Sequence, residues 1–311
     1  MNAAMKSLNE QIDEVMASAK SQRAKRDDLV KIGLCQHDID MLFFASRLGA
    51  KYGKKVSQLF SSYTFGVEIE CFNAPRPRLL TAANRQGLAM QSESYNHTDN
   101  RHYYKLVQDG SIRGTDPVEC VSPILQGDNS GFDSLKACCE ALNEIGAMVN
   151  KSTGLHVHVG GNITEQQYCN TFVNYYFLER LVDTFMAPSR RDAHYASSLH
   201  NSQCRRNVDA AGLLNATTFV DVWRAMNGDR YYKINSDSWQ RHHTIEFRQH
   251  GGTTNYEKIR MWALFCLKLV AWSADNRLSN DIHTIDEIPF LDETEKTYFK
   301  QRSNDLQRVA A

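Results

Sequence analysis

The sequence predicts an α+β fold, in which helices flank an antiparallel β-sheet that follows an N-terminal helical extension. Segments that alternate apolar and polar residues, typical of half-buried strands, recur between residues 63 and 251. Segments with helical periodicity separate them, without the regular strand–helix–strand order of a parallel sheet. The first 60 residues show helical patterns alone. We therefore expect a helical extension over residues 1–60 and one domain over residues 61–311.

The extension is expected to contain an amphipathic helix. Five apolar residues follow a 3,4,3,4 spacing that puts them on one helix face: Met5, Leu8, Ile12, Val15 and Ala19. A charged stretch over residues 20–28 comes next. Its basic side chains could contact an anion, but such a run more often forms a solvated helix face.

The elements of the main domain follow from their patterns and their cap residues. In chain order we expect a strand over TFGVEIECF, a helix over Leu79–Met90, a loop over Gln91–Arg101, a strand in HYYKLVQDGS that ends in an Asp-Gly turn, a strand in PVECVSPIL, a helix over 131–149, a strand in GLHVHVG, a helix over Thr164–Met186 capped by Thr164, an irregular segment over 187–215, a strand in HTIEFRQHGGT, a buried helix over 255–275 and a last helix over Asp292–Arg308.

The composition is that of an ordinary globular protein. The 36 basic and 36 acidic residues give a formal net charge of +0, which argues against general binding to nucleic acid or to a membrane surface. The longest apolar run, Met261–Trp272, is too short to span a membrane. The N-terminus lacks the apolar core of a signal peptide, so we expect a cytoplasmic protein. None of the eight cysteines forms a C-x-x-C pair, which favours free thiols.

The polar faces of the predicted strands carry mostly carboxylates and imidazoles. Residues two apart on a strand share a face, which groups Glu68 with Glu70, His156 with His158, and Glu246 with Arg248 and His250; Glu119 lies on a fourth strand. A half-exposed strand needs no function to carry polar residues. Solvent faces, however, favour mixtures of Thr, Lys, Arg, Ser and Gln. The repeated pattern therefore indicates a site.

Four glutamates gathered on one face would repel one another unless a cation compensates them. Carboxylates with an imidazole suit Mg²⁺ or Mn²⁺ better than zinc. Two such cations beside an arginine are a common arrangement for binding nucleotide phosphates. The sequence contains neither a P-loop nor a Gly-x-Gly-x-x-Gly motif, so a nucleotide would bind to a different kind of fold.

Four segments in this order resemble the putative amidoligase family, which belongs to the glutamine synthetase-like carboxylate–amine ligases: FGVEIE, KLVQDGSI followed by VECVSPIL, TGLHVHVG, and TIEFRQHGGT. The resemblance covers roughly residues 62–305. It implies that the antiparallel sheet curves into a partial barrel. It also implies that ATP and two or more Mg²⁺ (or Mn²⁺) ions bind in the funnel of that barrel.

The resemblance also implies roles for individual residues. Glu68 and Glu70 match a Glu-x-Glu pair that supplies one ligand to each of two metals. Glu119 would join the first metal, while His156 and Glu246 would complete the second. Arg248 would stabilise the transferring phosphoryl group or the tetrahedral intermediate. His158 has no clear equivalent: it either reaches the nucleotide or substrate, or supports the sheet.

The implied reaction is ATP-dependent joining of a carboxylate to an amine. The carboxylate attacks the γ-phosphate to give an acyl phosphate, and the amine then displaces phosphate to form an amide. The family is thought to act on amino acids or peptides, often in bacteria or their phages. The partners expected are therefore small-molecule or peptide carboxylates and amines, with neither nucleic acid nor a membrane involved. A homo-oligomer is possible, but a dodecamer is not implied, nor is ammonia as the amine.

Other residues are weaker candidates for substrate or nucleotide binding. The irregular segment 187–215 could be a lid, and its arginines could clamp a carboxylate or could be solvated loop charges: Arg190, Arg191, Arg205 and Arg206. Lys105 and Asp109 border the same funnel by sequence order, as do Lys233 and Asn235.

Two other functions compete with the ligase. A metal-dependent hydrolase would use His156 and His158 with the glutamate cluster to activate water. No H-E-x-x-H or H-x-x-E-H motif supports it. A non-catalytic binding module would have no need to keep every acidic ligand.

Overall fold

The computed structural model describes residues 8–34, 39, 62–94, 96 and 102–310. It divides the chain into two compact units, residues 1–58 and residues 59–311. No helix among these described residues is both long and apolar enough to cross a membrane. The seven cysteines in the described part are free thiols, and all but Cys204 are buried.

The first unit contains helix α1 (Leu8–Ala17) and helix α2 (Gln22–Lys31). Leu29 is fully buried, and Ile12 and Val15 of the expected apolar face pack against its cluster. The helix pair thus has a small hydrophobic core of its own.

The charged stretch over residues 20–28 leads into α2 and forms most of that helix, and some of its charges pair with one another. The Ser21 hydroxyl accepts a hydrogen bond from the backbone N–H of Ala24 and caps α2. The Lys20 ammonium lies 2.6 Å from Asp28, at the exposed surface. Met5, which was expected on the apolar face, lies outside the described residues.

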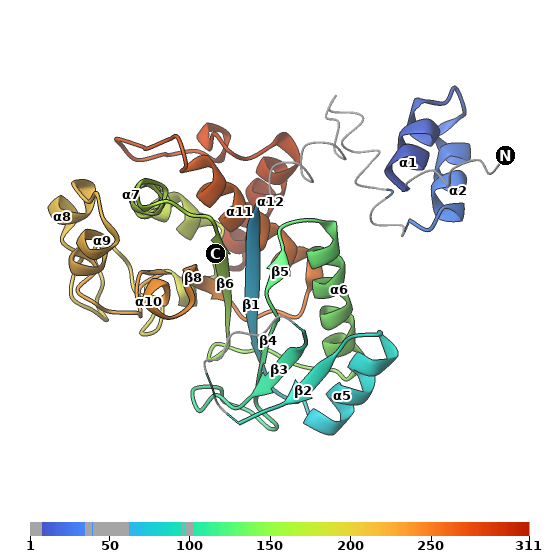
Figure 1. Cartoon of the computed structure of the whole chain (residues 1–311), viewed down its shortest axis with the longest axis horizontal. Coiled ribbons are helices and arrows are strands. Elements are labelled where there is room, and N and C mark those ends of the chain that lie inside the picture. The colour runs from blue at the N-terminus through green and yellow to red at the C-terminus, as the bar shows by residue number, and fades with distance from the viewer. Residues whose placement is uncertain (1–7, 35–38, 40–61, 95, 97–101, 311) are drawn as a thin grey trace. The chain divides into compact units, whose positions relative to one another are not determined.

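The second unit is built on one open, curved and mostly antiparallel sheet of eight strands (Figure 1). The order is β2-β3-β4-β1-β6-β8-β7, and β5 pairs with the beginning of β1. Among the named strands of the described residues, β2 and β3 are the one parallel pair. The strands are β1 (Tyr63–Cys71), β2 (Met90–Ser92), β3 (Tyr104–Val107), β4 (Val118–Val121), β5 (Leu125–Gln126), β6 (Gly154–Gly161), β7 (Ile234–Asn235) and β8 (Ile245–Gly251). The predicted α+β class is confirmed.

Helices flank this sheet (Figure 1). They are α5 (Arg76–Arg85), α6 (Asn129–Glu144), α7 (Glu165–Thr184), α8 (Ala210–Leu214), α9 (Phe219–Ala225), α10 (Ser238–His242), α11 (Tyr256–Trp272) and α12 (Glu293–Ala310), with short 3₁₀ turns at Pro188–Arg190 and Ile285–Glu287. The predicted irregular segment 187–215 therefore contains one 3₁₀ turn and α8.

Aromatic contacts show which face of the sheet the helices cover. Phe65 of β1 stacks on Phe132 of α6 at 4.8 Å. Phe247 of β8 meets Tyr175 of α7 at 5.7 Å and Trp262 of α11 at 6.4 Å. These apolar residues alternate with the polar residues of the same strands, so the opposite face of the sheet remains for the site.

Two predicted helices end earlier than expected, and each is followed by a glycine with positive φ. The helix predicted over Leu79–Met90 is α5, which begins before Pro77 because a proline fits the first turn. Gly87 follows it, with φ 68°. The helix predicted over 131–149 is α6, and Gly146, with φ 75°, follows it. Both backbone conformations suit glycine and end a helix.

A bulge between β6 and β8 changes which side chains of β8 face the site. Val157 pairs with Phe247, but Leu155 pairs with His250, so two residues of β8 lie opposite His156. An extra residue reverses the alternation beyond it. His250 consequently lies on the apolar face, 6.0 Å from the Trp262 ring. The expectation that His250 shares a face with Glu246 and Arg248 is wrong.

A buried ion cluster supports β8 from the helical side. The Lys233 ammonium, with no exposed side-chain surface, lies 2.8 Å from Glu179 and 2.8 Å from Asp183, both on α7. The Lys233 carbonyl accepts a hydrogen bond from the backbone N–H of Arg248, and the Gln249 amide donates to Asp183. Lys233 was expected to border the funnel, but its side chain points into the core instead.

This cluster should make stability depend on the protonation of Asp183. Burial raises the pKa of Asp183 from 3.8 to about 6, because the Lys233 ammonium, which also pairs with Glu179, only partly offsets the cost of burying the charge. The folded state therefore retains a proton that the unfolded chain has already released. Wild-type stability should fall as pH rises from 4 through 6, by up to roughly 3 kcal/mol from this group. Asp183→Asn should remove that slope in urea titrations at several pH values; an unchanged slope would contradict the assignment.

Candidate functional site

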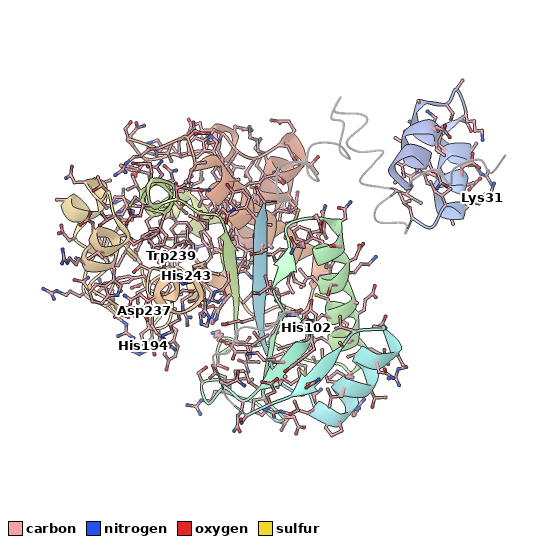
Figure 2. The ribbon with its side chains drawn as sticks, in the orientation of Figure 1. Lys31, His102, His194, Asp237, Trp239 and His243 are labelled. Carbon is pink, nitrogen blue, oxygen red and sulfur yellow. The ribbon has the colours of Figure 1, made fainter. Side chains whose placement is uncertain are left out.

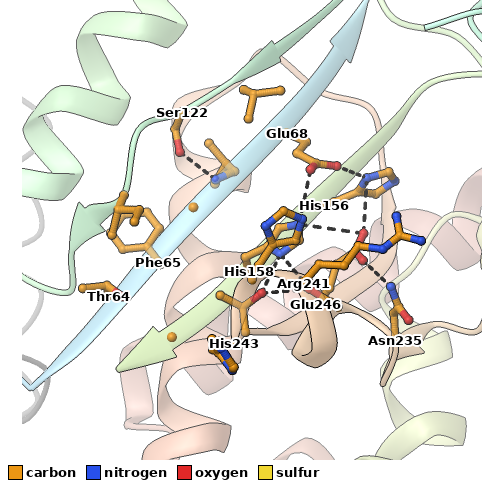
Figure 3. Close-up of a pocket in the computed structure, with 18 of the residues that line it drawn as sticks. Thr64, Phe65, Glu68, Ser122, His156, His158, Asn235, Arg241, His243 and Glu246 are labelled. Carbon is orange, nitrogen blue, oxygen red and sulfur yellow. Dashed lines mark hydrogen bonds and ion pairs between the residues drawn. The ribbon is translucent and has the colours of Figure 1, made fainter. Parts of the chain in front are cut away.

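The sheet register brings the predicted ligands of the metal site together. In adjacent strands, Glu68 lies opposite His156, and Glu70 lies opposite Glu119. On the other side of β6, His158 lies opposite Glu246. Directly opposed residues project from the same face of a sheet. The side chains of β1, β4, β6 and β8 therefore converge on the polar face, where Figure 3 shows Glu68, His156, His158 and Glu246 turned toward one another.

Two overlapping groups of side chains have ligand atoms within 4.8 Å of one another. One contains Glu68, His156 and Glu246; the other contains Glu70, Glu119 and His156. The His156 Nδ1 atom lies 2.7 Å from Glu68, and its Nε2 atom lies 3.6 Å from Glu70. The Glu-x-Glu pair is thus divided between the groups, as the resemblance implies, but His156 belongs to both.

The electrostatics of the cluster favour a bound cation. Burial, reinforced by the charges of Glu68 and Glu70, raises the pKa of Glu119 well above its usual value. Burial alone would also raise the pKa of Glu68, but the imidazoles of His156 and His158 hold it well below its usual range. Burial would raise the pKa of Glu246 as well, but the Arg248 guanidinium holds it below its usual value. Glu119 is therefore the carboxylate of this cluster whose ionisation a bound cation would favour.

Backbone and amide groups orient two of the glutamates. The N–H of Gly154 donates to Glu70 at 2.6 Å, and the Asn235 amide donates to Glu246. A side chain at Gly154 would put its Cβ 3.1 Å from the imidazole of His156. The glycine therefore permits this close packing of ligands.

Arg248 and His158 are held beside the cluster. The Arg248 guanidinium pairs with Glu246, and its Nε donates to the carbonyl of Tyr195 at 3.2 Å. His158 has its Nδ1 2.9 Å from the Thr244 hydroxyl and its Nε2 3.3 Å from Glu68. Burial would lower the pKa of His158, but the carboxylates of Glu246 and Glu68 raise it. His158 therefore touches the cluster directly.

Two cavities meet at this cluster. The larger, of about 550 Å³, is lined by Glu68, Glu119 and Glu246. The smaller, of about 380 Å³, is lined by Glu70. Four residues line both cavities and so define their junction: Asp109, His156, Arg230 and Arg248.

The segment over residues 237–244, which contains helix α10, forms one wall of the larger cavity. Trp239 of α10 stacks on Phe219 at 4.5 Å and meets Tyr168 of α7 at 5.0 Å. Figure 2 shows Asp237, Trp239 and His243 gathered around α10. His243, with φ 52°, ends the helix in the left-handed conformation and lines the cavity. This wall includes the basic and imidazole side chains of residues 241–243.

The three weaker candidates for substrate or nucleotide binding, Lys105, Arg190 and Arg191, differ in whether they line a cavity. Lys105 is buried and lines the larger cavity, where its ammonium donates to Asn96 at 3.1 Å. Arg190 is buried beside the smaller cavity, and its guanidinium donates to the carbonyls of Arg248 and Gln249 at the bulge. Arg191 lines neither cavity and donates instead to the Met186 carbonyl at 3.4 Å.

The sequence analysis missed several residues of the junction and of the smaller cavity. Arg230, Tyr231 and Tyr195 come from irregular segments whose sequence shows no periodicity. Asp109, which was expected to border the funnel with Lys105, lines both cavities. The tertiary fold alone brings these segments to the ends of the strands.

A curved sheet with carboxylate and imidazole side chains converging between two cavities is an arrangement typical of enzymes. The model of the family described as putative amidoligase enzyme matches residues 61–270, more than half of the chain. The chain therefore belongs to this family, and the resemblance predicted from the sequence is confirmed. Membership makes the protein a ligase-type enzyme. No curated protein compared with the chain matched it.

Proposed function

We propose that the protein is an ATP-dependent carboxylate–amine ligase that works through an acyl phosphate. One observation carries the proposal: two ligand groups share His156 at the junction of two cavities. A ligase of this kind must hold a nucleotide and a carboxylate on either side of the phosphoryl group that passes between them. The larger cavity would hold the nucleotide, and the smaller would hold the carboxylate substrate.

The donor set of the two groups fits Mg²⁺ or Mn²⁺. Carboxylate oxygens predominate, and one imidazole completes each group: Glu70 and Glu119 with His156, and Glu68 and Glu246 with His156. Burial, together with the charges of Glu68 and Glu70, raises the pKa of Glu119, and a divalent ion beside it would favour its ionised form. Bound there, they would withdraw charge from the phosphoryl oxygens.

The residues around the junction would bind and orient the reactants. The substrate carboxylate would attack the γ-phosphorus of ATP, releasing ADP and giving the acyl phosphate; the amine would then form the amide, releasing phosphate and a proton. Arg248, fixed by Glu246 and by the Tyr195 carbonyl, would stabilise charge that develops on the transferred group. The burial of Arg248, Glu246 and His156 helps to exclude water, which would hydrolyse an acyl phosphate.

Nucleotide binding is expected to require the divalent ion. A non-hydrolysable ATP analogue with Mg²⁺ should raise the melting temperature, and the analogue with EDTA should not. At a hundred times the dissociation constant, the expected stabilisation is about 2.7 kcal/mol. Melting curves with analogue alone, Mg²⁺ alone and both together provide the test. A metal-dependent hydrolase would respond to Mg²⁺ but not to the analogue, so that result would replace the ligase proposal.

A further inference from the structure

The C-terminal helix α12 reaches the core side of the bulge in β8. Its Phe299 ring packs on the ring of Phe185, which follows α7, with the ring centres 4.6 Å apart. One turn further along the helix, Arg302 donates through Nε to the Phe185 carbonyl at 2.8 Å, and its Nη2 lies 3.3 Å from Nε2 of His250. The match to the amidoligase family ends at residue 270, so family membership assigns no role to α12.

The contacts of His250 fix which of its ring nitrogens carries the proton. Its Nδ1 lies 2.7 Å from the carbonyl oxygen of Gly251, which can only accept, so Nδ1 must donate. Its Nε2 faces the guanidinium of Arg302, which can only donate, so Nε2 must accept. Burial lowers the pKa of His250 from 6.5 to about 3, and the charge of Arg302 reinforces this. The ring is therefore neutral at neutral pH, with its proton on Nδ1.

The backbone beyond the bulge in turn holds a ligand of the metal site. Gly251 of β8 pairs with Gly154 of β6, and the Gly154 N–H donates to Glu70 at 2.6 Å. Glu70 belongs to one of the two ligand groups. A series of hydrogen bonds and one strand pairing therefore leads from Arg302 to Glu70 through His250, Gly251 and Gly154.

The bulge itself depends on which side of the sheet His250 faces. With a regular ladder continued from the pair of Val157 and Phe247, His250 would pair with Gly154 and turn to the polar face, beside Glu70. The bulge turns it to the core instead. Since the hydrogen bond from Arg302 forms only when His250 faces the core, it favours the bulged register.

We propose that Arg302 is a positioning residue of the metal site: by binding His250 it holds the bulge of β8, and through the bulge it keeps the Gly154 N–H on Glu70. The inference rests on the proposed function, to which the divalent ions belong. Arg302 lines neither cavity, so it acts on the site through the backbone of β8 and β6.

The test replaces Arg302 in the full chain and measures Mn²⁺ binding by electron paramagnetic resonance. Nuclear magnetic resonance of the same proteins reports the imidazole nitrogens of His250 and the amide proton of Gly154. In the wild type, His250 should be neutral with its proton on Nδ1. Arg302→Met should lose this signature, shift the Gly154 resonance and lower the Mn²⁺ affinity about tenfold, the lower end of the range for losing an outer contact at a metal site.

Two further variants separate positioning from a general loss of stability. Arg302→Lys keeps the charge and can serve one of the two acceptors, so it should restore part of the Mn²⁺ affinity. Adding His250→Leu to Arg302→Met should lower the affinity no further than either change alone, because the two residues act as one unit. Should Arg302→Met not fold, Arg302→Lys and His250→Leu provide the comparison, and both should bind Mn²⁺ more weakly than the wild type.

Lys300→Met is the matched control, because Lys300 lies on the same helix and pairs with Asp286 at the surface. It should bind Mn²⁺ as the wild type does. The inference is overturned if the Arg302 variants lower only the melting temperature, if Lys300→Met weakens Mn²⁺ equally, or if His250 carries its proton on Nε2. A wild type that binds no Mn²⁺ would overturn the ligase proposal instead. The Gly154 resonance would then decide whether Arg302 positions Glu70: a shift in Arg302→Met would support it, and an unchanged resonance would refute it.

Discussion

Replacing Glu119 with glutamine is expected to stabilise the metal-free protein while removing its response to Mn²⁺. Glu119 is buried beside Glu68 and Glu70, and this environment raises its pKa well above the usual value. A raised folded-state pKa means that wild-type stability falls as pH rises through it. A neutral amide of the same shape avoids this loss, so in EDTA the free energy of unfolding of Glu119→Gln should exceed that of the wild type, by a margin that grows as pH rises.

The same substitution removes a ligand atom from the group of Glu70, Glu119 and His156. Mn²⁺ affinity should fall by at least the roughly 10- to 100-fold that loss of a supporting contact costs at a metal site. Turnover should be lost with it, since the proposed phosphoryl transfer needs the ions. Mn²⁺ titration by electron paramagnetic resonance and melting in EDTA measure the two effects.

Asp237→Asn provides the matched control for Glu119→Gln. Asp237 also lines the larger cavity but lies outside both ligand groups, and its nearest ion pair is with Arg241 at 3.7 Å. This variant should bind Mn²⁺ as the wild type does. If the two variants behave alike, Glu119 is not part of a metal site.

The second large effect concerns stability rather than chemistry. Lys233→Met should destabilise the protein by about 3–5 kcal/mol, because it leaves Glu179 and Asp183 buried without their cation. The backbone of residue 233 also accepts the N–H of Arg248, so the bulge should loosen. Urea denaturation at pH 7 measures the loss.

Two comparison variants make this result specific. Adding Glu179→Gln to Lys233→Met removes one of the two unpaired charges and should restore part of the stability. Lys300→Met breaks the ion pair with Asp286, in which 44% and 61% of the side chains are exposed, and should cost less than about 1 kcal/mol. Equal losses at Lys233 and Lys300 would mean that the buried cluster contributes no more than a surface pair.

Much of this architecture could be predicted because a strand has a period of two. That period grouped Glu68 with Glu70 and His156 with His158, and in the structure each pair faces the cluster. The Thr164 cap predicted the start of α7, and its hydroxyl accepts from Gln167. Such patterns involve only residues that are close in sequence, and this explains why the predicted face of His250 was wrong. A bulge is a mismatch between two strands, so β8 alone could not reveal that His250 turns to the core.

From the amino-acid order alone, the family and the residue types on each strand face could be predicted, except beyond the bulge in β8, because alternation and capping act over a few neighbouring residues. Tertiary structure decided the rest. It placed Glu70 opposite Glu119, turned Lys233 toward α7 and left Arg230 beside Tyr231 at the junction of two cavities. These relations depend on sheet register and on irregular segments, where the energy of contact between distant residues outweighs any local preference.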